Sequence, residues 1–521
     1  MQPQTRRSRW AAFAGVVAAG ALVLSACGGG ADSPAEGGEG AGTINVGVAY
    51  ETTNYHPSNT SSALAMGTNW HVVEGLYEFD MSNYEIYDAL AAGDPVEVSP
   101  TEYEITLRDG AKFSDGTDVT AEDVVTSIER SNAEGNLYAS FLSFIDSVSA
   151  KDDTTVTITL KQPFTLLKER LAVVKIVPAG ASDEDLTAMP IGTGPWKYES
   201  ITDTDITAVP NEHYNGKFPA GAAEMHWMVQ KDDTARTTAA SDGTIQVMEA
   251  VPAENVDVLK NAGLTVEEVP GFNLPFLLFN TTKAPFDNPK VRQAFHMAID
   301  RQKLVDNAMA GKAKVATSFL PESHPNYKKA ETQFDYDVDA AKALLAEAGV
   351  EPGEITLLTT DHPWITNLSP QIRTDLEALG FTVNVQAEAS ASLYSNNLDV
   401  EGTPTFDIAV APGDPSVFGN DPALLMSWWY GDNVWTQKRT FWQTSDKAAF
   451  DTLSAIINEA TTLEGAEQQA KWDEAQDFLA EQVPLYPLFH RTMITAYDAE
   501  KLDNVKPIAT TGIWLVGAST K

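Results

Sequence analysis

The sequence has only one cysteine among its 521 residues. With Cys27 alone, no disulfide can form within the chain. Basic residues are also scarce, because 35 lysines and arginines stand against 73 aspartates and glutamates and give a formal net charge of −38. Nucleic acids are bound by basic faces that neutralise phosphate, so this charge argues against a nucleic-acid-binding protein. An excess of acidic residues is typical of a well-solvated surface.

Long apolar runs are missing beyond the first residues of the chain, so no later segment is expected to cross a membrane. The N-terminus differs, with three arginines ahead of an uncharged apolar run at residues 11–24. This run is too short to span a bilayer and is followed at once by LSAC, so residues 1–26 are predicted to be a secretory signal peptide. LSAC resembles the bacterial lipobox, in which the cysteine becomes the first mature residue and receives lipid. We therefore expect lipidation of Cys27 and a lipid-anchored protein on the extracytoplasmic face of the cell membrane.

A glycine-rich segment separates this cysteine from the rest of the chain. Residues 28–42 contain 7 glycines and almost no bulky apolar side chain. Such a composition cannot bury enough surface to offset the entropy of ordering, so residues 27–42 are predicted to be the lipidated cysteine and a flexible tether. The remaining body is long enough for about two or three domains. With 43% hydrophobic and 21% charged residues overall, it is expected to be globular.

Strand and helix patterns alternate along the body, which predicts an α/β fold. Residues 43–50 (TINVGVAY) alternate apolar and polar side chains as a strand does. Residues 355–411 hold ITLLTT, SPQIRTDLEALG, FTVNVQAE and FDIAVA, which are predicted to form a strand, a helix and two strands. The short links favour a parallel unit with a right-handed crossover. Ligands of open α/β sheets lie beyond the carboxyl ends of strands, so the loops after TINVGVAY and FDIAVA are expected to carry binding residues.

Two helices have clear end signals. Thr120 and Asp123 form a capping-box pattern before an apolar stripe. Residues 287–311 are predicted to form one continuous helix, with Pro289 in the first turn and Gly311 as its C-terminal cap. His296 lies in this helix without a second histidine at ligand spacing, so a packed histidine is favoured over a metal ligand.

The usual signatures of catalysis and of cofactor binding are missing. The sequence has no Gly-x-Ser-x-Gly elbow and no His-Glu-x-x-His motif. Residues 190–196 (PIGTGPW) lack the Lys-Ser/Thr ending of a phosphate-binding loop. Residues 334–345 (FDYDVDAAKALL) lack the glycine and glutamate that an EF-hand loop requires. We therefore predict no catalytic residue, cofactor or metal, and a protein that is not an enzyme.

Several blocks of the sequence, taken in order, resemble the extracellular solute-binding proteins of family 5, the peptide-type receptors of ABC importers. These blocks are YEITLRDGAKFSDGTDVTAEDVVTSIER (103–130), PIGTGPW (190–196), FNTTKAPFDNPKVRQAFHMAIDRQKLVDNAMAG (279–311), DVDAAKALLAEAG (337–349) and EQVPLYPLFH (481–490). The resemblance implies a two-lobed periplasmic-binding-protein-like fold, with an extra subdomain on lobe I and a two-strand hinge. Such lobes close around a ligand that stabilises the closed form.

The resemblance also implies domain boundaries. The implied parts are lobe I at 43–80, 188–278 and 491–521, the subdomain at 81–187, and lobe II at 279–490. The chain would cross between the lobes near Phe279–Thr281 and Phe489–Arg491.

By this resemblance the protein is a monomeric receptor that hands a solute to the permease and ATPase of an ABC transporter. An oligopeptide is the favoured solute, because strand-like edges hold a peptide backbone while pockets accept its side chains. Clustered tryptophans with Asp, Asn and Gln would also suit an oligosaccharide. Opines and metal chelates are carried by the same architecture, and a cell-envelope scaffold of this fold that does not feed transport is a further alternative.

Candidate ligand contacts follow from these expectations. In peptide-binding relatives an aspartate of the second lobe pairs with the α-ammonium of the peptide. Asp414 is the candidate here, although direct alignment would place Phe418 at that position. Trp428 and Trp429 point about 100° apart on a helix, so we expect one in the core and one, with Asp414 or Trp435, at the ligand. The other candidates lie in the loop after the first strand and near the first crossing: Asn54, Tyr55, His56 and Asn273.

Overall fold

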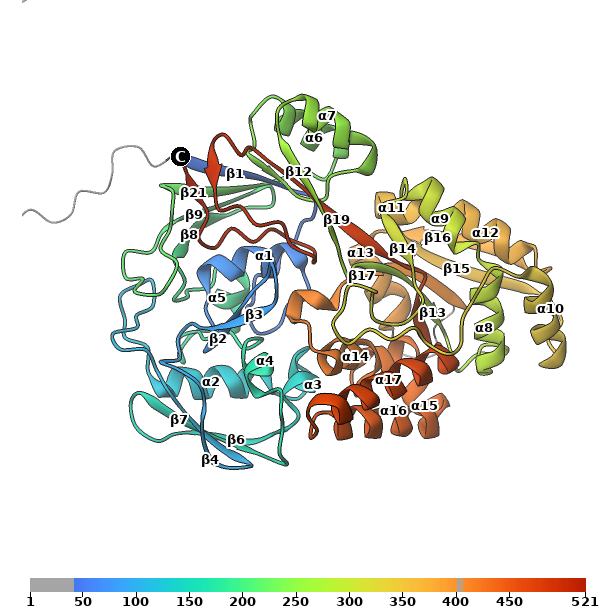
Figure 1. The fold of residues 1–521 in the computed structure, drawn as a ribbon, viewed down its shortest axis with the longest axis horizontal. Coiled ribbons are helices and arrows are strands. Elements are labelled where there is room, and N and C mark those ends of the chain that lie inside the picture. Colours follow the sequence, from blue (N-terminus) through green and yellow to red (C-terminus); the bar gives the residue numbers. More distant parts are fainter. Residues whose placement is uncertain (1–41, 401–403, 405) are drawn as a thin grey trace, which may run out of the picture. The chain divides into compact units, whose positions relative to one another are not determined.

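The computed structural model describes residues 42–400, 404 and 406–521. The predicted signal peptide, Cys27 and nearly all of the predicted tether lie outside the described residues. Helices and strands are both abundant, which confirms the α/β class (Figure 1). Within the described part of the chain, no helix is both long enough and apolar enough to cross a membrane.

The first sheet is built around β1 (Thr43–Val48), the strand predicted at the start of the body. It pairs in parallel with β10 (Glu224–Val229) on one side and β11 (Val247–Met248) on the other. Its alternating apolar side chains are buried. The strand order is β12-β19-β11-β1-β10-β9-β8. The outer strands are β8 (Trp196–Ile201), β9 (Asp205–Pro210), β12 (Thr265–Pro270) and β19 (Phe489–Tyr497).

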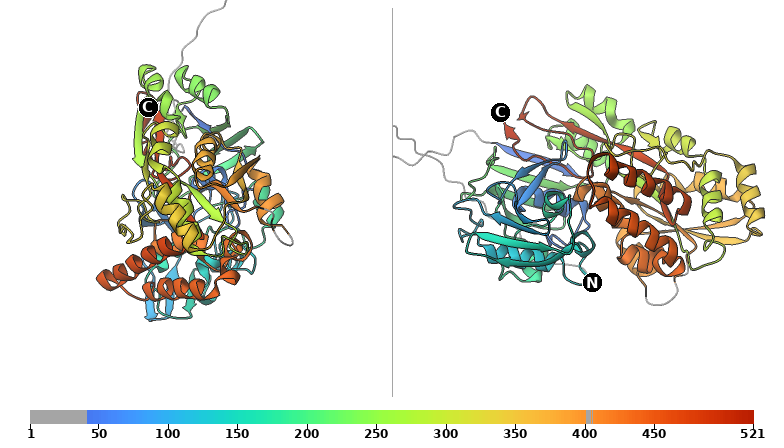
Figure 2. Two further views of the ribbon diagram at one scale, coloured as in Figure 1. Left: turned by 90° about the vertical axis from the view of Figure 1, so that its right-hand side faces the viewer. Right: turned by 60° about the horizontal axis from the view of Figure 1, so that its bottom comes forward.

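The second sheet contains the predicted parallel unit. β15 (Glu354–Thr360) pairs in parallel with both β16 (Thr382–Glu388) and β17 (Ile408–Gly413), and α12 (Ser369–Glu377) lies between β15 and β16 in the chain. The order is β16-β15-β17-β13-β18, with β13 (Leu274–Phe279) and β18 (Leu485–Pro487) joined in antiparallel pairs. The helices α16 (Lys447–Ala460) and α17 (Gly465–Gln482) of this half run side by side (Figures 1 and 2).

The chain passes between the two sheets twice. It leaves β12 of the first sheet and enters β13 of the second at Gly271–Asn273, and it returns from β18 to β19 at Leu488. The two passages are hydrogen-bonded to each other, since the Arg491 amide donates to the Asn273 carbonyl at 2.7 Å. Figure 1 shows β19 reaching past β13 and β14 (Ala313–Val315).

The position of the first passage corrects the sequence expectation. We placed it near Phe279–Thr281, but the apolar run Leu274–Phe279 is a fully buried strand that pairs with β17 and β18. A strand with two neighbours belongs inside the second sheet, so the passage comes earlier. The return falls where it was expected, beside Phe489–Arg491.

A separate antiparallel sheet lies within the range predicted for the subdomain. Its order is β4 (Val96–Ser99), β5 (Glu102–Thr106), β7 (Thr155–Leu160) and β6 (Ile145–Ala150). Helix α2 (Ala121–Ser131) contacts β6 and β7 and begins with the predicted capping box, in which the Thr120 amide donates to Asp123 Oδ2 at 2.8 Å.

The continuous helix predicted over residues 287–311 is two helices. These are α8 (Pro289–Ala298) and α9 (Arg301–Ala308). Ile299 between them has an extended backbone with ψ 118°, and the Asp300 carboxylate accepts from the Lys303 amide at 3.0 Å. The Asp300 side chain stabilises the start of a new helix at α9, and a capping residue has a non-helical backbone, so Asp300 explains the break.

His296 on α8 is a packed histidine of the second lobe. Its ring lies 5.1–5.9 Å from the rings of Phe279, Phe334 and Tyr486, and no hydrogen-bond partner to either ring nitrogen is found in the described residues. Burial, with smaller effects from two nearby arginines, lowers the pKa of His296 well below its usual 6.5. As the pH falls, His296 is therefore protonated in the unfolded chain before it is protonated in the folded chain. The fold loses stability below about pH 6.5 for this reason.

This gives a pH-dependent prediction. Between pH 7.5 and 5.5 the wild type should lose about 1.4 kcal/mol more unfolding free energy than His296→Phe, because the variant lacks the imidazole that is protonated in the unfolded chain but not in the folded one. Urea unfolding at both pH values measures the difference. His213→Gln, at a partly exposed histidine, is the control. Equal losses in the wild type and His296→Phe would contradict the assignment.

The glycines of PIGTGPW allow a close approach of two backbones. A Cβ on Gly192 would lie 2.1 Å from the carbonyl oxygen of Val72, and one on Gly194 would lie 2.5 Å from that of His71. Both carbonyls belong to the end of α1 (Ala63–Val72). The Gly194 amide also donates to the Val72 carbonyl at 2.9 Å. Any larger residue would push the turn away from the helix.

We expect Gly192→Ala to lower the free energy of unfolding by about 1–3 kcal/mol, the usual cost of overpacking. Gly180→Ala is the matched control, because a Cβ there meets no atom within 4 Å. Urea unfolding of both variants tests the prediction, which fails if the two substitutions cost the same.

Candidate ligand-binding cleft

Side chains that follow the carboxyl ends of two strands meet at one place. Tyr50 comes soon after β1, and His362 and Trp364 come soon after β15. The Tyr50 and His362 rings lie 5.3 Å apart. The guanidinium of Arg491, on β19, lies 4.2 Å from the ring centre of Trp364. The two sheets therefore bring aromatic rings and a cation together where the chain passes between them.

The Arg491 guanidinium is half-buried and has few partners. It donates to Asn273 Oδ1 at 3.2 Å, and it forms no ion pair with a carboxylate of the described residues. Partial burial lowers the pKa of Arg491 below its usual value, against the opposing effects of Tyr50 and Asp414. The Tyr50 side chain is a further hydrogen-bond partner of the guanidinium, which thus has polar partners but no carboxylate partner among the described residues.

Asp414 directly follows β17 and accepts five hydrogen bonds from the protein itself. The Ser416 amide donates to one oxygen at 3.2 Å, and the Ser416 hydroxyl donates to it as well. The other oxygen accepts from Thr510 Oγ1 at 3.1 Å and from the amide and hydroxyl of Thr511, both at 2.8 Å. Burial raises the pKa of Asp414 in spite of these donors.

The segment 510–512 joins Asp414 to two further polar side chains. Asn273 Nδ2 donates to Thr511 Oγ1 at 2.9 Å. Glu249 follows β11 and accepts from the Gly512 amide at 2.8 Å. Its side chain is buried, and burial raises the pKa of Glu249. Two carboxylates and one guanidinium are therefore linked through neighbouring residues.

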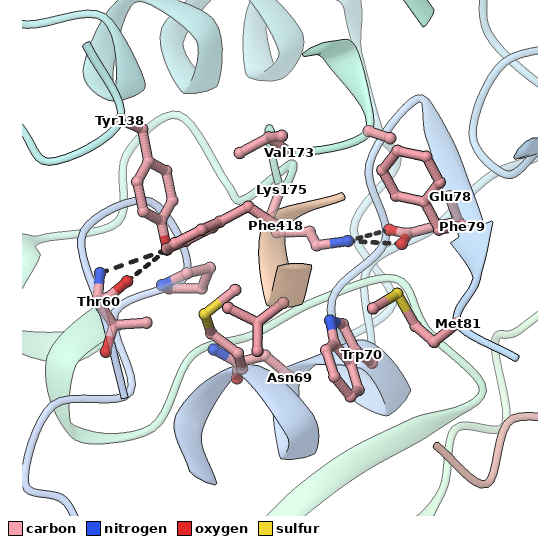
Figure 3. Close-up of a pocket in the computed structure, with 14 residues that line it drawn as sticks. Thr60, Asn69, Trp70, Glu78, Phe79, Met81, Tyr138, Val173, Lys175 and Phe418 are labelled. Atoms are coloured by element: carbon pink, nitrogen blue, oxygen red, sulfur yellow. Dashed lines mark hydrogen bonds and ion pairs between the residues drawn. The ribbon is translucent and has the colours of Figure 1, made fainter. Parts of the chain in front are cut away.

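A pocket lies beside Trp70, whose ring would lie 3.2 Å from a Cβ on Gly512 (Figure 3). It is small, with room of about 30 Å³ for water-sized molecules. At one end Lys175 Nζ lies 2.6 Å from Glu78 Oε2, and at the other the Tyr138 hydroxyl donates to the Thr60 carbonyl at 2.8 Å (Figure 3). Phe418, at the end of the short helix that starts at Pro415, closes one side.

Comparison with known proteins identifies the family. A model described as "Bacterial extracellular solute-binding proteins, family 5 Middle" matches residues 85–449. The chain belongs to this family. It is therefore a solute-binding protein rather than an enzyme.

Individual relatives of this family 5 protein agree in length and fold. The glutathione-binding protein GsiB of Salmonella typhi is 27% identical over 488 residues, which cover 91% of each chain. DppA from Helicobacter pylori, solved with the peptide STSA, has a TM-score of 0.79 at 20% identity and covers 92% of this chain and 98% of its own. NikA from Staphylococcus aureus, solved with Ni(L-His)2, has a TM-score of 0.78 at 21% identity and covers 92% and 100%. These structures confirm the two-lobed fold.

The predicted loop residues of this family 5 protein are bonded within their own lobe. The Asn54 side chain accepts from the His56 amide and donates to the Asn59 carbonyl. His56 Nε2 lies 3.4 Å from Asp183. Tyr55 is buried, and burial raises its pKa to about 12. The same loop supplies Pro57 and Thr60 to the pocket, so it reaches the cleft through neighbours of the predicted residues. A ligand role for Asn54, Tyr55 and His56 stays a prediction.

The tryptophans of the second lobe form a packed cluster. Trp429 is fully buried, and its ring would lie 2.4 Å from a Cβ on Gly413. Trp428 is also buried, with its ring 4.9 Å from that of Phe418. Trp435 lies 6.3 Å from both of these rings. Trp428 thus supports a pocket wall from behind, and direct ligand contact by any of the three remains to be tested.

Sequence reasoning did not select Tyr50, Glu249, Trp364 or Arg491. The rule that ligands lie beyond strand ends could have found Tyr50 and Trp364, since Tyr50 ends one predicted strand and Trp364 follows another. Arg491 was placed at a crossing but was given no role. Glu249 follows a strand of only two residues, which has no clear sequence signal.

Proposed function

We propose that this protein is a lipid-anchored receptor that captures a short peptide between its lobes and delivers it to the permease of an ABC importer. The observation that carries the proposal is the half-buried Arg491 guanidinium, which lacks a carboxylate partner among the described residues and lies near the buried Glu249 and the half-buried Asp414. A peptide carries one carboxylate and one ammonium, and this arrangement is complementary to both.

Each charge of the peptide has a complementary group in the cleft. A carboxylate accepts two parallel hydrogen bonds from a guanidinium, and the Arg491 guanidinium lies 4.2 Å from the ring centre of Trp364. An ammonium would be attracted by Glu249 and Asp414. Because Asp414 already accepts five protein hydrogen bonds, an ammonium there would replace some of the threonine donors.

The same cation argues against an uncharged oligosaccharide. A neutral sugar would cover Arg491 without neutralising it, and a desolvated charge without a partner is costly. The name of the GsiB relatives supports an amino-acid-derived solute, since glutathione is itself a small peptide.

Membrane attachment is part of the proposal and rests on the N-terminal sequence. If Cys27 carries the lipid, Cys27→Ser should move the protein from the membrane fraction to the soluble extracytoplasmic fraction. Cell fractionation measures this. An unchanged membrane fraction would argue against the anchor.

The solute is tested on protein purified under native conditions and then denatured. Mass spectrometry of the released material should recover intact peptides. Calorimetric titration with glutathione and dipeptides should give binding, whereas a matched series of neutral oligosaccharides should not. A ligand at 100 times its Kd should also stabilise the fold by about 2.7 kcal/mol. Recovery of glycans alone would overturn the peptide, and binding of neither class would favour a scaffold.

A further inference from the structure

A second, larger pocket lies between two parts of the chain that are far apart in the sequence. Residues 140–170 form one side of it, and helices α14 (Pro422–Tyr430) and α16 form the other. Helix α3 (Ala139–Leu142), on the first side, contacts α14 on the second (Figure 1). The pocket has room of about 230 Å³ for water-sized molecules, against about 30 Å³ beside Trp70. It can therefore hold a small organic molecule rather than a few waters alone.

Packed aromatic rings separate this second pocket from the pocket beside Trp70. Phe141 lines the second pocket, and its ring lies 5.3 Å from that of Phe418 and 5.9 Å from that of Trp428. Phe418 lines the pocket beside Trp70. Among the described residues the two pockets share no lining side chain, and the second is lined by neither Arg491 nor Asp414. The second pocket is therefore separate from the group of charges proposed to hold the solute.

The charge of the second pocket is opposite to that of the protein. Its described lining residues include one lysine and one arginine but no aspartate or glutamate, in a chain with 73 acidic residues. Arg170 is neutralised by the Asp421 carboxylate, to which it donates at 3.0 and 3.1 Å. Lys161 has no carboxylate partner in the described part of the chain, and its ammonium donates to the Ser143 carbonyl at 2.7 Å. Two of the three N–H groups of this lysine are left for a ligand.

The rest of the lining combines hydroxyl and amide groups with an apolar side. The amides of Gln162 and Asn458 and the hydroxyl of Ser427 have no hydrogen-bond partner within the described residues. Amides and hydroxyls both donate and accept, so they can bind the hydroxyl groups of a ligand. Phe144 and Phe164, with rings stacked 3.8 Å apart, offer an apolar face to its carbon skeleton.

We propose that this pocket is a second binding site, which takes a small soluble polyol phosphate. Lys161 binds the phosphate, for which a lysine ammonium is a suitable partner, and the amides and hydroxyls of the lining bind the polyol. The proposal does not depend on which solute the cleft carries. An occupant touches both residues 140–170 and helices α14 and α16, so it stabilises the arrangement in which these two parts lie together.

The test is calorimetric titration of the purified protein with glycerol 3-phosphate, inorganic phosphate and glycerol. Glycerol 3-phosphate should bind about 10-fold more tightly than inorganic phosphate, because only the former offers hydroxyls to the lining. Glycerol should show no binding over the same range of concentration, because it lacks the charge. If glycerol 3-phosphate binds no more tightly than inorganic phosphate, the assigned class of ligand is wrong. If neither anion binds, there is no such site.

Variants of exposed lining residues locate the binding without disturbing the fold. Lys161→Met should weaken glycerol 3-phosphate about 10- to 100-fold, the usual effect of losing a hydrogen bond to a charged group. Asn458→Asp adds a carboxylate of the same shape to the lining and should weaken the anion as well. The matched control is Lys260→Met, which removes the same charge from an exposed position on α7 (Val256–Asn261). An affinity that Lys161→Met leaves unchanged, or that both lysine variants lower equally, would contradict the assignment.

Discussion

Replacing Arg491 by methionine is expected to remove most of the affinity for peptides that carry a free carboxylate. Truncating one partner of a buried, hydrogen-bonded charge pair costs about 2–5 kcal/mol, which corresponds to a loss of about 30-fold to several thousand-fold. The loss should be much smaller for peptides with an amidated C-terminus, because these never had the bond. Calorimetric titration of both peptide forms measures the effect.

The fold itself should tolerate this change. Methionine keeps the length of the side chain beside Trp364, and it removes a desolvated charge that has no ion-pair partner among the described residues. We therefore expect the unliganded unfolding free energy to change little or to rise. Arg491→Lys is the control, since it keeps the charge and loses the planar fork. Equal affinities of wild type and Arg491→Met for free-acid peptides would refute the role.

Replacing Arg170 by methionine is expected to have the largest effect on stability. The Arg170 guanidinium binds both oxygens of Asp421, at 3.0 and 3.1 Å, and each side chain is only 4% exposed. Asp421 also caps α14 (Pro422–Tyr430), accepting from the Leu424 amide at 2.7 Å. Removal of the cation leaves a buried carboxylate without its partner, which costs about 3–5 kcal/mol.

Urea unfolding tests this prediction, and a double variant identifies its cause. Asp421→Asn in the Arg170→Met background should recover part of the loss, because the amide can still cap the helix and carries no charge. The exposed pair of Lys447 and Asp451 is the comparison, since Lys447→Met should cost less than about 0.5 kcal/mol. If Arg170→Met costs no more than Lys447→Met, the pair contributes nothing to stability.

Local patterns predicted much of the fold, because the information for them lies within a few residues. The capping box at Thr120, the strand at residues 43–50 and the parallel unit at residues 355–411 all follow from periodicity and end signals. The break at Asp300 was missed because a capping aspartate inside an apolar pattern looks like an ordinary polar position. The first crossing was misplaced because the apolar sequence of β13 does not show which strands it pairs with, and those partners decide which sheet it belongs to.

The cleft was predictable only in part. Asp414 could be selected from its place after a strand, but its partners Thr510 and Thr511 are 96 and 97 residues away in the chain. Nothing near Asp414 in the sequence indicates them. The role of Arg491 depends on burial and on a missing counter-charge among the described residues, and both are properties of the folded molecule. The pocket gathers Trp70, Lys175 and Phe418 from three distant segments.

The hydrogen bonds between the two chain passages have a consequence for the order of events during uptake. Arg491 lies on one passage and is bonded to Asn273 on the other, so it lies at the connection between the two sheets, and a turn of one lobe against the other about this connection would have its axis nearby. Groups on an axis of rotation move least. The carboxylate of a peptide could therefore attach to Arg491 while the lobes are still apart, before the groups farther from the axis arrive. The same contact would be the last to break, so the solute would leave the receptor with its carboxylate end trailing.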